Sequence, residues 1–553
     1  MNKQYDIAVI GGGPAGYTAA LTAARQGAAV VLFEKEHLGG VCTNRGCVPM
    51  KTYLATASAL EKASRLDVLN IRTSASFENE AAACSITYHV DMAGLKKRKD
   101  GVIAQLRSGI EALLRSSGVA IVPAEAKLEK VANRTIVEET VACSGGNSDA
   151  FCISAGEDIY SARRVILCCG SRPMALSFSK DSDTADAVEA QEASPVLTDS
   201  AHQATCVMPA EDLFALEERP DRLVLIGGGV VGCEMAAAYA AFGTAVTIVE
   251  CAGEILTGFD KDIQRQCARS LKEQGVDIRL NMTVTAVNAE AVILSDGQIL
   301  PLSAKSLVAF AAGRRPVWEA LGIFREQVMA EDGRSLVVSD YLETTVPGLY
   351  VCGDMTGRAH LAHEATAMGE VAAAHAVRSL GAKGGAGNPI SETQESRVGK
   401  TAQGIGCVQS EVAAQSAGSE NSHIFVKENV PVCLYVLPEM AGIGLTEQKA
   451  RERGGIKIGK FPLTYNARAM AEGGKSGFVK VIADEVDGRI LGVHMVGDRA
   501  TDLIAEAKVM MDQNMTIFAA AAVIHPHPTY AEALYEACRD AAGMCLNLPL
   551  RRR

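Results

Sequence analysis

The chain has 553 residues, a formal net charge of −11 and an apolar fraction of 48%. Its length fits several domains with sizeable cores, and its acidity argues against nucleic acid as the main partner. No apolar run reaches the roughly 18–20 residues that span a bilayer, and the N-terminal residues lack a signal-peptide pattern, so we expect no membrane partner and a cytoplasmic location. In such a reducing compartment the 16 cysteines should mostly be free thiols. Because no CxxC pair occurs, no metal site is predicted.

The first predicted group of elements is a strand, a glycine turn, a helix and a second strand over residues 5–34. The turn carries Gly11, Gly13 and Gly16 in a GxGxxG pattern, and Glu34 closes the second strand 23 residues past the first glycine. Such glycines let the backbone approach a pyrophosphate at the helix N-terminus, and the acid can accept a hydrogen bond from a ribose hydroxyl. This unit predicts one bound dinucleotide.

Residues 39–51, GGVCTNRGCVPMK, contain Cys42 and Cys47, with Lys51 close behind and a helix-forming run from Thr52. Backbone N–H groups at a helix start favour the thiolate, and a nearby lysine adds to that bias. The pair is therefore placed for disulfide chemistry, although the spacing alone also fits a structural bridge. Further on, the basic run at 96–99 is interpreted as a solvated helix face.

A second strand–glycine turn–helix–strand unit covers residues 223–250, with Gly227, Gly229 and Gly232 in the turn and Glu250 at the end. Two such units predict two dinucleotides, and a flavin with a nicotinamide is the natural pair for hydride transfer. A 2′-phosphate would meet the carboxylate of Glu250, and like charges cost several kcal/mol, so NAD is preferred over NADP. The alternative is that Glu250 only caps a strand.

Four segments separate these elements without a regular apolar pattern: residues 66–88, 143–149, 174–211 and 381–422. The Gly, Ser, Gln and Asn content of the last one predicts a mobile surface loop. No chemistry is apparent in the four segments, and an effect on partner docking stays open.

Several further motifs, in this order along the chain, resemble those of the pyridine nucleotide–disulfide oxidoreductases, and among them those of the dihydrolipoamide dehydrogenases. Beside the cysteine motif at 39–51 they are CCGSRP at 168–173, AAGRRP at 311–316, TTVPGLYVCGDMTG at 344–357, LAHEA at 361–365, the stretches 457–484 and 488–497, and HPHPTYAE at 525–532. The chain is identified by them as a member of this family.

The resemblance implies an α/β fold with two Rossmann-like dinucleotide-binding domains, the FAD domain being split around the NAD domain, and a C-terminal α+β dimerisation domain. The implied boundaries are 1–173 for the first FAD part with the redox disulfide, 174–315 for the NAD domain with its N-terminal linker, 316–380 for the second FAD part, 381–425 for an inserted flexible loop and 426–553 for the interface domain.

The family pattern also implies roles at the redox centre. Cys42 corresponds to the thiol that exchanges with substrate sulfur, and Cys47 to the thiol that lies against the flavin and forms a charge-transfer pair with it. Lys51 corresponds to the residue near flavin N5, and Glu234 to its ion-pair partner. The alternative for Glu234 is a solvated helix face.

The family's base and its orienting carboxylate correspond to His527 and Glu532, which in the family come from the other subunit of a homodimer. His525 is next to this base in the sequence, and whether it acts in catalysis or only in structure stays open. Cys538 and Cys545 are interpreted as ordinary helix residues, unlike the adjacent cysteine pair of mercuric reductases. Smaller departures from the pattern, such as Glu364, remove no catalytic atom.

Further cofactor contacts are implied by position in the motifs. For FAD they are Gly11, Gly13, Pro14, Ala15, Gly16, Glu34, Lys35, Gly40, Val41, Lys51, Ala126, Gly170, Asp354, Leu361 and Ala362. For NAD they are Gly227, Gly229, Val230, Val231, Gly232, Glu234, Glu250, Val284 and Gly313.

The function implied is that of an FAD-containing, NAD-dependent dihydrolipoyl dehydrogenase. Its partner would be a lipoyl-bearing acyltransferase or an H-protein-type carrier of a 2-oxoacid dehydrogenase or glycine cleavage complex. The alternatives are a related NAD(P)H-dependent disulfide or mercuric-type reductase, and a flavoprotein subunit that acts mainly as a scaffold.

Overall fold

The computed structural model describes residues 3–64, 66, 88–129, 150–174, 176, 207–381 and 429–549, apart from positions 334, 359 and 475. The loop expected at 143–149 and most of those expected at 66–88, 174–211 and 381–425 lie outside the described residues. The expected end of the third loop is wrong, because Val207–Pro209 form a strand and a 3-10 turn begins at Ala210. Among the described residues, no helix is both long and apolar enough to cross a bilayer.

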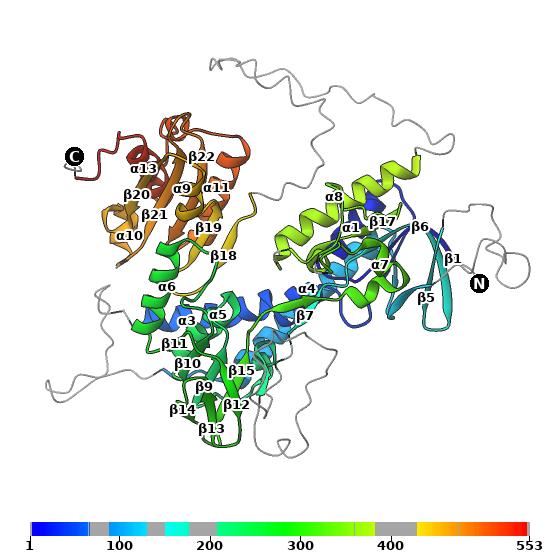
Figure 1. Ribbon diagram of the computed structural model, residues 1–553, viewed down its shortest axis with the longest axis horizontal. Helices are drawn as coiled ribbons and strands as arrows, with labels where there is room; N and C mark the ends of the chain where they lie inside the picture. Colours follow the sequence, from blue (N-terminus) through cyan, green and yellow to red (C-terminus); the bar gives the residue numbers. More distant parts are fainter. Residues whose placement is uncertain are drawn as a thin grey trace, which may run out of the picture. The chain divides into compact units, whose positions relative to one another are not determined.

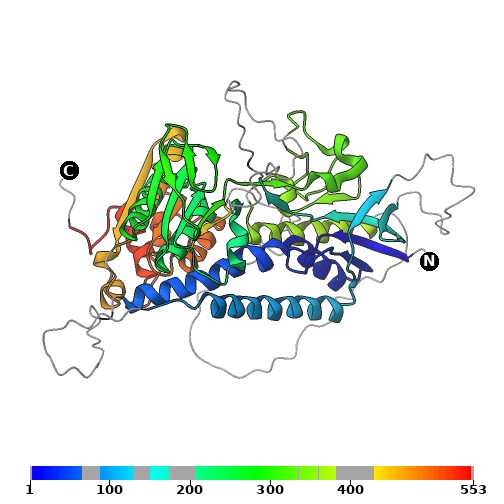
Figure 2. The same ribbon diagram turned by 90° about the horizontal axis from the view of Figure 1, so that it is seen from below.

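The chain folds into two compact units. Unit 1 combines Met1–Gly40, Arg107–Ser171 and Pro316–Val426, and unit 2 combines Val41–Leu106, Arg172–Arg315 and Lys427–Arg553. The chain passes from one to the other in α4 (Met92–Ser116), which is a single long helix (Figure 2), and in β7 (Ser171–Pro173) and β16 (Arg314–Pro316), which pair with each other. The segment with Cys42 and Cys47 therefore belongs to unit 2, together with the second glycine turn and the C-terminal part.

A mostly parallel sheet with the order β3-β2-β1-β6-β5-β4 is the centre of unit 1, and β17 also pairs with β6. Its strands are β1 (Lys3–Ile10), β2 (Val30–Phe33), β3 (Ala120–Val122), β4 (Ala126–Glu129), β5 (Phe151–Ala155), β6 (Asp158–Leu167) and β17 (Leu349–Val351). β1 lies between two parallel neighbours, and its residues from Ile7 to Ile10 are all buried. An unbroken apolar run is typical of a strand with both faces covered.

Two helices of unit 1, α1 (Pro14–Arg25) and α8 (Ala362–Gly381), pack closely together (Figure 1). A Cβ at Gly369 would lie 2.3 Å from the carbonyl oxygen of Ala15, so glycine is required for this approach. The same packing brings the turn after β17 to the first glycine turn, since a Cβ at Gly353 would lie 3.3 Å from the Cβ of Ala15. The unit also contains α7 (Arg325–Val328) and 3-10 turns at Trp318–Phe324 and Gly353–Thr356.

Unit 2 contains a second parallel sheet, with the order β11-β10-β9-β15-β8. Its strands are β8 (Val207–Pro209), β9 (Arg222–Ile226), β10 (Ala245–Glu250), β11 (Asp277–Leu280) and β15 (Ser306–Phe310), and its helices are α5 (Val230–Ala241) and α6 (Lys261–Glu273). Residues 232–239 of α5 are all buried, so this helix is covered on every side. A 3-10 turn, Ala210–Ala215, and a small antiparallel sheet of β12 (Val284–Val287), β13 (Ala291–Leu294) and β14 (Ile299–Pro301) complete this part.

The C-terminal part of unit 2 is an antiparallel sheet with helices packed against it. The sheet order is β18 (Val432–Leu434), β19 (Met440–Gly444), β22 (Ile490–Val496), β21 (Phe478–Asp484) and β20 (Ile456–Pro462). Its helices are α9 (Glu447–Arg453), α10 (Ala467–Ala471), α11 (Ala500–Asp512), α12 (Ile517–Ala520) and α13 (Glu532–Ala541), with a 3-10 turn at Leu463–Tyr465. This alternation of strands and helices confirms the α/β dinucleotide-binding domains and the α+β C-terminal domain expected from the sequence.

The cysteine segment forms two helices, α2 (Gly40–Arg45) and α3 (Cys47–Ala63), and α3 packs against α5. Tyr53 of α3 lies edge-on to Phe214 at 5.1 Å and tilted against Tyr239 at 6.4 Å. Core residues of β18, β19 and the ends of β21 and β22 join the same apolar cluster. The redox helix therefore shares one core with the second parallel-sheet domain and with the C-terminal sheet.

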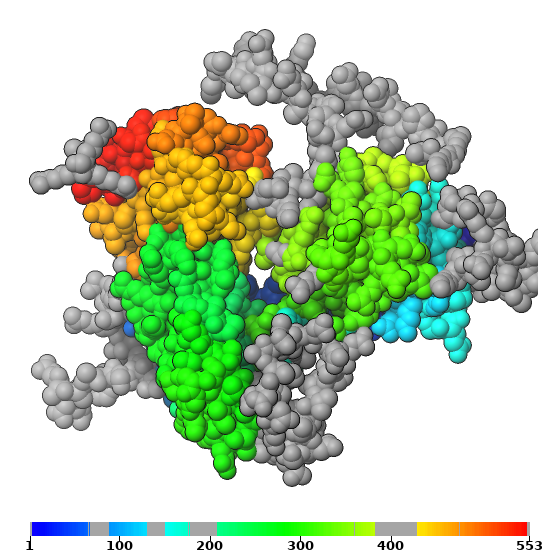
Figure 3. Space-filling model, viewed as in Figure 1, coloured from blue at the N-terminus to red at the C-terminus, as the bar shows by residue number. Residues whose placement is uncertain are grey.

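Buried charges also join the C-terminal sheet to α6 within unit 2, where Figure 3 shows the two parts (yellow to red, and green) in direct contact. Lys480 of β21 has a side chain that is only 2% exposed, and its ammonium lies 2.5 Å from Asp260 and 3.0 Å from Asp262. Glu447 of α9 adds a third carboxylate at 3.2 Å. A buried ion needs such partners, so this cluster fixes how the two parts of unit 2 meet.

Three further local expectations are wrong. The redox helix begins at Cys47 rather than at Thr52, because Pro49 lies in the first turn, where a missing N–H costs nothing. The run at 96–99 is not a fully solvated face: Lys99 is buried, and its ammonium donates to the carbonyl oxygen of Phe214 at 2.9 Å. Cys545 is not a helix residue, since α13 ends at Ala541 and Gly543 follows in the left-handed conformation.

Candidate active site

The two cysteines of the expected redox pair lie on different helices. Cys42 is in α2, and Cys47 is the first residue of α3. Gly46 joins the helices closely, since a Cβ there would lie 3.2 Å from the carbonyl oxygen of Val41. The structure shows both cysteines as free, partly exposed thiols. Free backbone N–H groups at the start of α3 favour negative charge at Cys47.

The pair divides its protons unequally. The Cys42 thiol donates a hydrogen bond to the Cys47 sulfur, and this bond is the largest cause that lowers the pKa of Cys47 to about 7, against the opposing effect of burial. The positive charge of Lys51 lowers this pKa further, and the charge of Glu234 raises it. The pKa of Cys42 is raised, first by the same hydrogen bond and then by burial. In the reduced state Cys47 is therefore the sulfur that ionises first, and Cys42 keeps its proton.

Lys51 forms the ion pair that the sequence predicts. Its ammonium lies 3.2 Å and 3.1 Å from the two carboxylate oxygens of Glu234. The side chain of Glu234 is only 4% exposed, which excludes the solvated helix face considered as its alternative.

Tyr435 contacts the Lys51–Glu234 pair, although no sequence pattern pointed to it. Its ring centre lies 4.0 Å from the Lys51 ammonium, and its backbone N–H donates to Glu234 at 2.9 Å. It follows the short edge strand β18, and no motif or periodicity relates it to α3. An aromatic residue in an apolar run is ordinarily assigned to the core, so its contact with a charge was not evident.

His527 and Glu532 form a hydrogen-bonded pair, as the sequence predicts. Nδ1 of His527 lies 2.8 Å from Oε1 of Glu532, and the backbone N–H of Thr529 donates to Oε2 of the same carboxylate at 2.7 Å. The His527 side chain is 70% exposed. Within the described residues of a single chain, no hydrogen bond or ion pair connects this pair to either cysteine of the redox pair.

His525, the neighbouring histidine, is placed differently. Its side chain is 5% exposed, and Nε2 lies 2.7 Å from Glu506 of α11. Nδ1 lies 3.1 Å from the carbonyl oxygen of Val523, and the ring is tilted against Tyr535 at 5.3 Å. Both ring nitrogens are engaged within the domain, so His525 anchors the segment that presents His527.

The glycine turn of unit 1 fits a dinucleotide. Gly11 has φ +102°, and a Cβ there would lie 2.3 Å from the carbonyl oxygen of Cys168, while a Cβ at Gly16 would lie 1.8 Å from the carbonyl oxygen of Gly11. Gly13 caps α1, whose first residue is Pro14. The turn therefore leaves the helix N-terminus uncovered by side chains, as a pyrophosphate requires.

Glu34 closes this turn from the next strand. Its carboxylate accepts hydrogen bonds from Gly12 N–H at 2.7 Å and from Glu36 N–H at 2.8 Å. In the same unit Asp354 accepts a hydrogen bond from the Ser171 hydroxyl at 2.5 Å. These contacts place both acids at the carboxyl ends of parallel strands, where dinucleotides bind in such sheets.

The remaining expected FAD contacts are distributed over both units. In unit 1, Lys35 pairs with Glu125 at 3.2 Å, Ala126 opens β4, Gly170 has φ +72°, and Leu361 and Ala362 lie at the start of α8. Gly40 approaches the first turn so closely that a Cβ on it would lie 2.7 Å from the Cα of Gly13. Val41 and Lys51 belong to unit 2.

The glycine turn of unit 2 repeats this geometry. A Cβ at Gly227 would lie 2.6 Å from the carbonyl oxygen of Ala311, and a Cβ at Gly232 would lie 2.0 Å from that of Gly227. Glu250 accepts hydrogen bonds from Gly228 N–H at 2.6 Å and from Ala252 N–H at 2.8 Å. The carboxylate that would read the NAD ribose is therefore fixed by the backbone of its own site.

The other expected NAD contacts lie in the same unit. Gly229 caps α5, Val230 and Val231 are its first residues, Val284 opens β12, and Gly313 has φ +112°.

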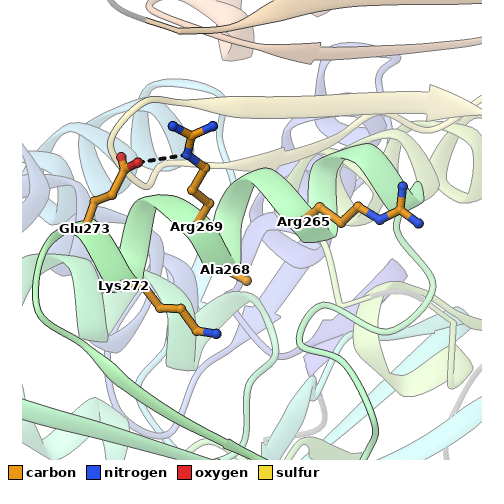
Figure 4. Close-up of a pocket in the computed structure, with 5 residues that line it drawn as sticks. All are labelled: Arg265, Ala268, Arg269, Lys272 and Glu273. Atoms are coloured by element: carbon orange, nitrogen blue, oxygen red, sulfur yellow. Dashed lines mark hydrogen bonds and ion pairs between the residues drawn. The ribbon is translucent and has the colours of Figure 1, made fainter.

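A shallow hollow on the exposed face of α6 is separate from these residues. Arg265, Ala268, Arg269, Lys272 and Glu273 line it, and Arg269 pairs with Glu273 at 2.8 Å (Figure 4). None of the expected site residues contributes to it. The described part of the chain also contains no group of three or more His, Cys, Asp or Glu side chains that could bind a metal ion.

Comparison with known proteins matches residues 5–369 and residues 430–538 to one protein family. Residues 5–369 match the family model described as pyridine nucleotide-disulphide oxidoreductase, and residues 430–538 match the dimerisation domain of that family. A protein of Bacillus subtilis named dihydrolipoyl dehydrogenase is 31% identical over 98% of this chain and 99% of its own length. One of Rhizobium etli with the same name is 30% identical over 99% of this chain and 100% of its own.

Solved structures show the same fold. The LpdA protein of Mycobacterium tuberculosis has a TM-score of 0.72 at 22% identity, and the comparison covers 97% of this chain and 99% of that one. The HOCl-induced flavoprotein disulfide reductase RclA of Escherichia coli has a TM-score of 0.70 at 23% identity, over 97% and 99% of the two chains. These matches cover nearly the whole chain, and they agree with the two glycine turns shaped for dinucleotides and with the cysteine pair at a helix start. The chain belongs to the pyridine nucleotide–disulphide oxidoreductases and is an FAD-dependent NAD oxidoreductase with a C-terminal dimerisation domain.

Proposed function

We propose that this enzyme is a dihydrolipoyl dehydrogenase, which oxidises protein-bound dihydrolipoamide to lipoamide and reduces NAD⁺ to NADH. The observation that carries the proposal is the Cys42–Cys47 pair, in which one sulfur keeps its proton and the other has a pKa lowered to about 7. Full-length relatives that bear this name support the choice of substrate.

The two sulfurs then have separate tasks. A substrate thiolate attacks Cys42 in the oxidised pair, the Cys42–Cys47 bond breaks, and Cys47 leaves as the thiolate. The second substrate thiolate then attacks the substrate sulfur of the mixed disulfide, the bond from that sulfur to Cys42 breaks, and lipoamide leaves while Cys42 takes up one of the two substrate protons. Cys47 is the better leaving group because its pKa is the lower of the two.

His527 takes the protons that the substrate dithiol gives up. Its Nδ1 is engaged by Glu532, which leaves Nε2 as the basic atom at an exposed position. Because no contact within one described chain connects this pair to the cysteines, we propose that His527 acts on the cysteine pair of the other subunit in a homodimer.

Bound FAD would supply the redox chemistry that links the thiolate of the reduced cysteine pair to hydride transfer onto NAD⁺. In this proposal Lys51, paired with Glu234 at 3.1 Å, would stabilise negative charge on the reduced flavin. Glu250 selects NAD, because its fixed carboxylate would face the 2′-phosphate of NADP.

The proposed partner is a lipoyl-bearing acyltransferase or H-protein-type carrier. The proposed location is the cytoplasm, where a reducing environment would keep most of the 16 cysteines as free thiols.

The experiment is an activity comparison in the NAD⁺-reducing and NADH-oxidising directions. The enzyme should turn over dihydrolipoamide and lipoamide faster than glutathione disulfide, other small disulfides or Hg²⁺. Negligible lipoamide turnover with activity on another disulfide or on Hg²⁺ would replace the proposal by a related reductase. Cys47→Ser provides the control: if the complex and its biological output survive without turnover, the scaffold function is favoured instead.

A further inference from the structure

The ammonium of Lys51 lies between groups from two other elements of unit 2. The Glu234 carboxylate of α5 is on one side, at 3.1 and 3.2 Å. The ring of Tyr435, which follows β18, is on another, with its centre 4.0 Å from the ammonium. The backbone N–H of Tyr435 donates to the same carboxylate at 2.9 Å. One residue therefore touches both members of the ion pair.

Tyr435 is itself fixed by the C-terminal domain. Its phenol is hydrogen-bonded to Thr501 of α11, and the Thr501 hydroxyl donates to Glu439 at 2.7 Å. Burial is the main cause that raises the pKa of Tyr435 to about 12, so the ring is neutral at physiological pH. A neutral aromatic face attracts an ammonium through its quadrupole.

We propose that Tyr435 is a positioning residue of the redox centre: its ring and its backbone N–H keep Lys51 and Glu234 in the arrangement that favours the thiolate of Cys47. The use of that thiolate rests on the proposed function, whereas the arrangement itself needs no particular substrate.

The position of the ammonium matters because its two neighbours act in opposite directions on Cys47. Lys51, one helical turn beyond Cys47, lowers the pKa of this thiol, and Glu234 raises it. The Lys51 side chain is 36% exposed, so without the ring the ammonium can turn into water, where its charge is screened. The carboxylate is nearly fully buried and stays. The balance would then move towards the protonated thiol.

Cys433, another titratable group on which the charge of Lys51 acts, adds no charge itself. Cys433 of β18 has its pKa raised to about 11, chiefly by burial, so it is a neutral thiol at physiological pH. Cys42 acts on Cys47 through the hydrogen bond between them, which the removal of a ring at Tyr435 leaves in place.

Tyr435 also packs against the core around α3 and α5, so a purely structural role is the alternative. Two substitutions separate the roles. Tyr435→Phe keeps the ring face and the backbone N–H and loses only the phenol oxygen. Tyr435→Leu keeps the N–H and apolar bulk and loses the aromatic face.

The experiment compares these two variants with the wild type and with Phe518→Leu, which removes the ring 5.6 Å from Lys457 in the same domain. Each holoenzyme is reduced with NADH, and iodoacetamide labelling of Cys47 is followed by peptide mass spectrometry across a pH series. The long-wavelength charge-transfer absorbance is recorded in parallel. We expect Tyr435→Leu to raise the midpoint of both profiles by about half a pH unit, a roughly threefold loss of thiolate below the midpoint. Tyr435→Phe and Phe518→Leu should keep the wild-type midpoint.

An unchanged midpoint in a folded Tyr435→Leu enzyme would overturn the proposal. Equal shifts in the Phe and Leu variants would overturn it as well, because the ring face would then not be the cause. If the Leu variant does not fold, Tyr435→Met fills the same space with a flexible side chain and must show the shift. Neither readout involves a lipoyl substrate, so failure of the lipoamide assay would contradict the proposed function and leave this test intact.

Discussion

Among the described residues of unit 2, two pairs of cysteines have sulfurs in contact but differ in exposure and in the direction of their pKa shifts. Cys42 and Cys47 are partly exposed, and the pKa of Cys47 is lowered to about 7. Cys233 of α5 and Cys267 of α6 also touch, yet both are fully buried, and the pKa of Cys233 is raised by the hydrogen bond to Cys267 and by burial. A thiol pair becomes reactive through a helix start, a cation and access to substrate, and the spacing of its cysteines is secondary.

The largest effect should come from removing one sulfur of each pair in turn. Cys47→Ser should lower lipoamide turnover by about 10³-fold or more, because no disulfide can form. Cys267→Ala should leave turnover unchanged and affect only the melting temperature. Steady-state kinetics and thermal melts of both variants check this. Equal losses of turnover in the two variants would contradict the claim that Cys42 and Cys47 are the reactive pair and that Cys233 and Cys267 are not.

The second largest effect should come from a substitution that removes the proposed base, His527, and leaves both cysteine pairs intact. His527→Gln should lower lipoamide turnover by about 10²–10⁴-fold, since proton transfer is lost. Reduction of the flavin by NADH should change little. Stopped-flow measurement of the NADH half-reaction beside steady-state turnover separates the two. An equal loss in both would indicate misfolding rather than a missing base.

A smaller effect should arise at the electron acceptor. Glu250→Arg should move the ratio of NADH to NADPH efficiency by about 100-fold towards NADPH, because a carboxylate is replaced by a charge that attracts the 2′-phosphate. The sulfur chemistry of both pairs should not change. The ratio of kcat/KM for NADH to kcat/KM for NADPH measures this change in selectivity. An unchanged ratio would refute the role of Glu250 in reading the ribose.

The smallest of these effects should come from removing the positive charge of Lys51 while both cysteine pairs are kept. Lys51→Gln should raise the pKa of Cys47 by about one unit, which lowers the thiolate fraction at pH 7 from about a half to about a tenth. Iodoacetamide labelling of the reduced enzyme should slow in proportion at Cys47 and stay negligible at Cys233. If labelling of Cys47 is as fast as in the wild type, the lysine is not the cause that separates the two pairs.

The sequence predicted the parts of the fold and of the site that depend on neighbours in the chain. Both glycine turns, Glu34 and Glu250 follow from a strand–turn–helix–strand pattern confined to about 30 residues. The His527–Glu532 pair is likewise local, with its members on one loop and the helix start that follows it. The expected α/β domains are confirmed for the same reason.

What the sequence could not predict depends on contacts between distant segments. Tyr435, Glu506 and the Lys480–Asp260 pair act through side chains that meet only after the sheets pack. Gly543 could have shown that α13 ends before Cys545, because glycine commonly follows the last helical residue.

The most direct test of the account is a pH titration of the charge-transfer absorbance in the NADH-reduced wild-type enzyme. The thiolate is present above the pKa of Cys47 and is lost as the pH falls through it, so the band should disappear on acidification with a midpoint near pH 7. A midpoint near 9, the value of an ordinary thiol, or the absence of a band would contradict the claim that Cys47 is the activated sulfur beside the flavin.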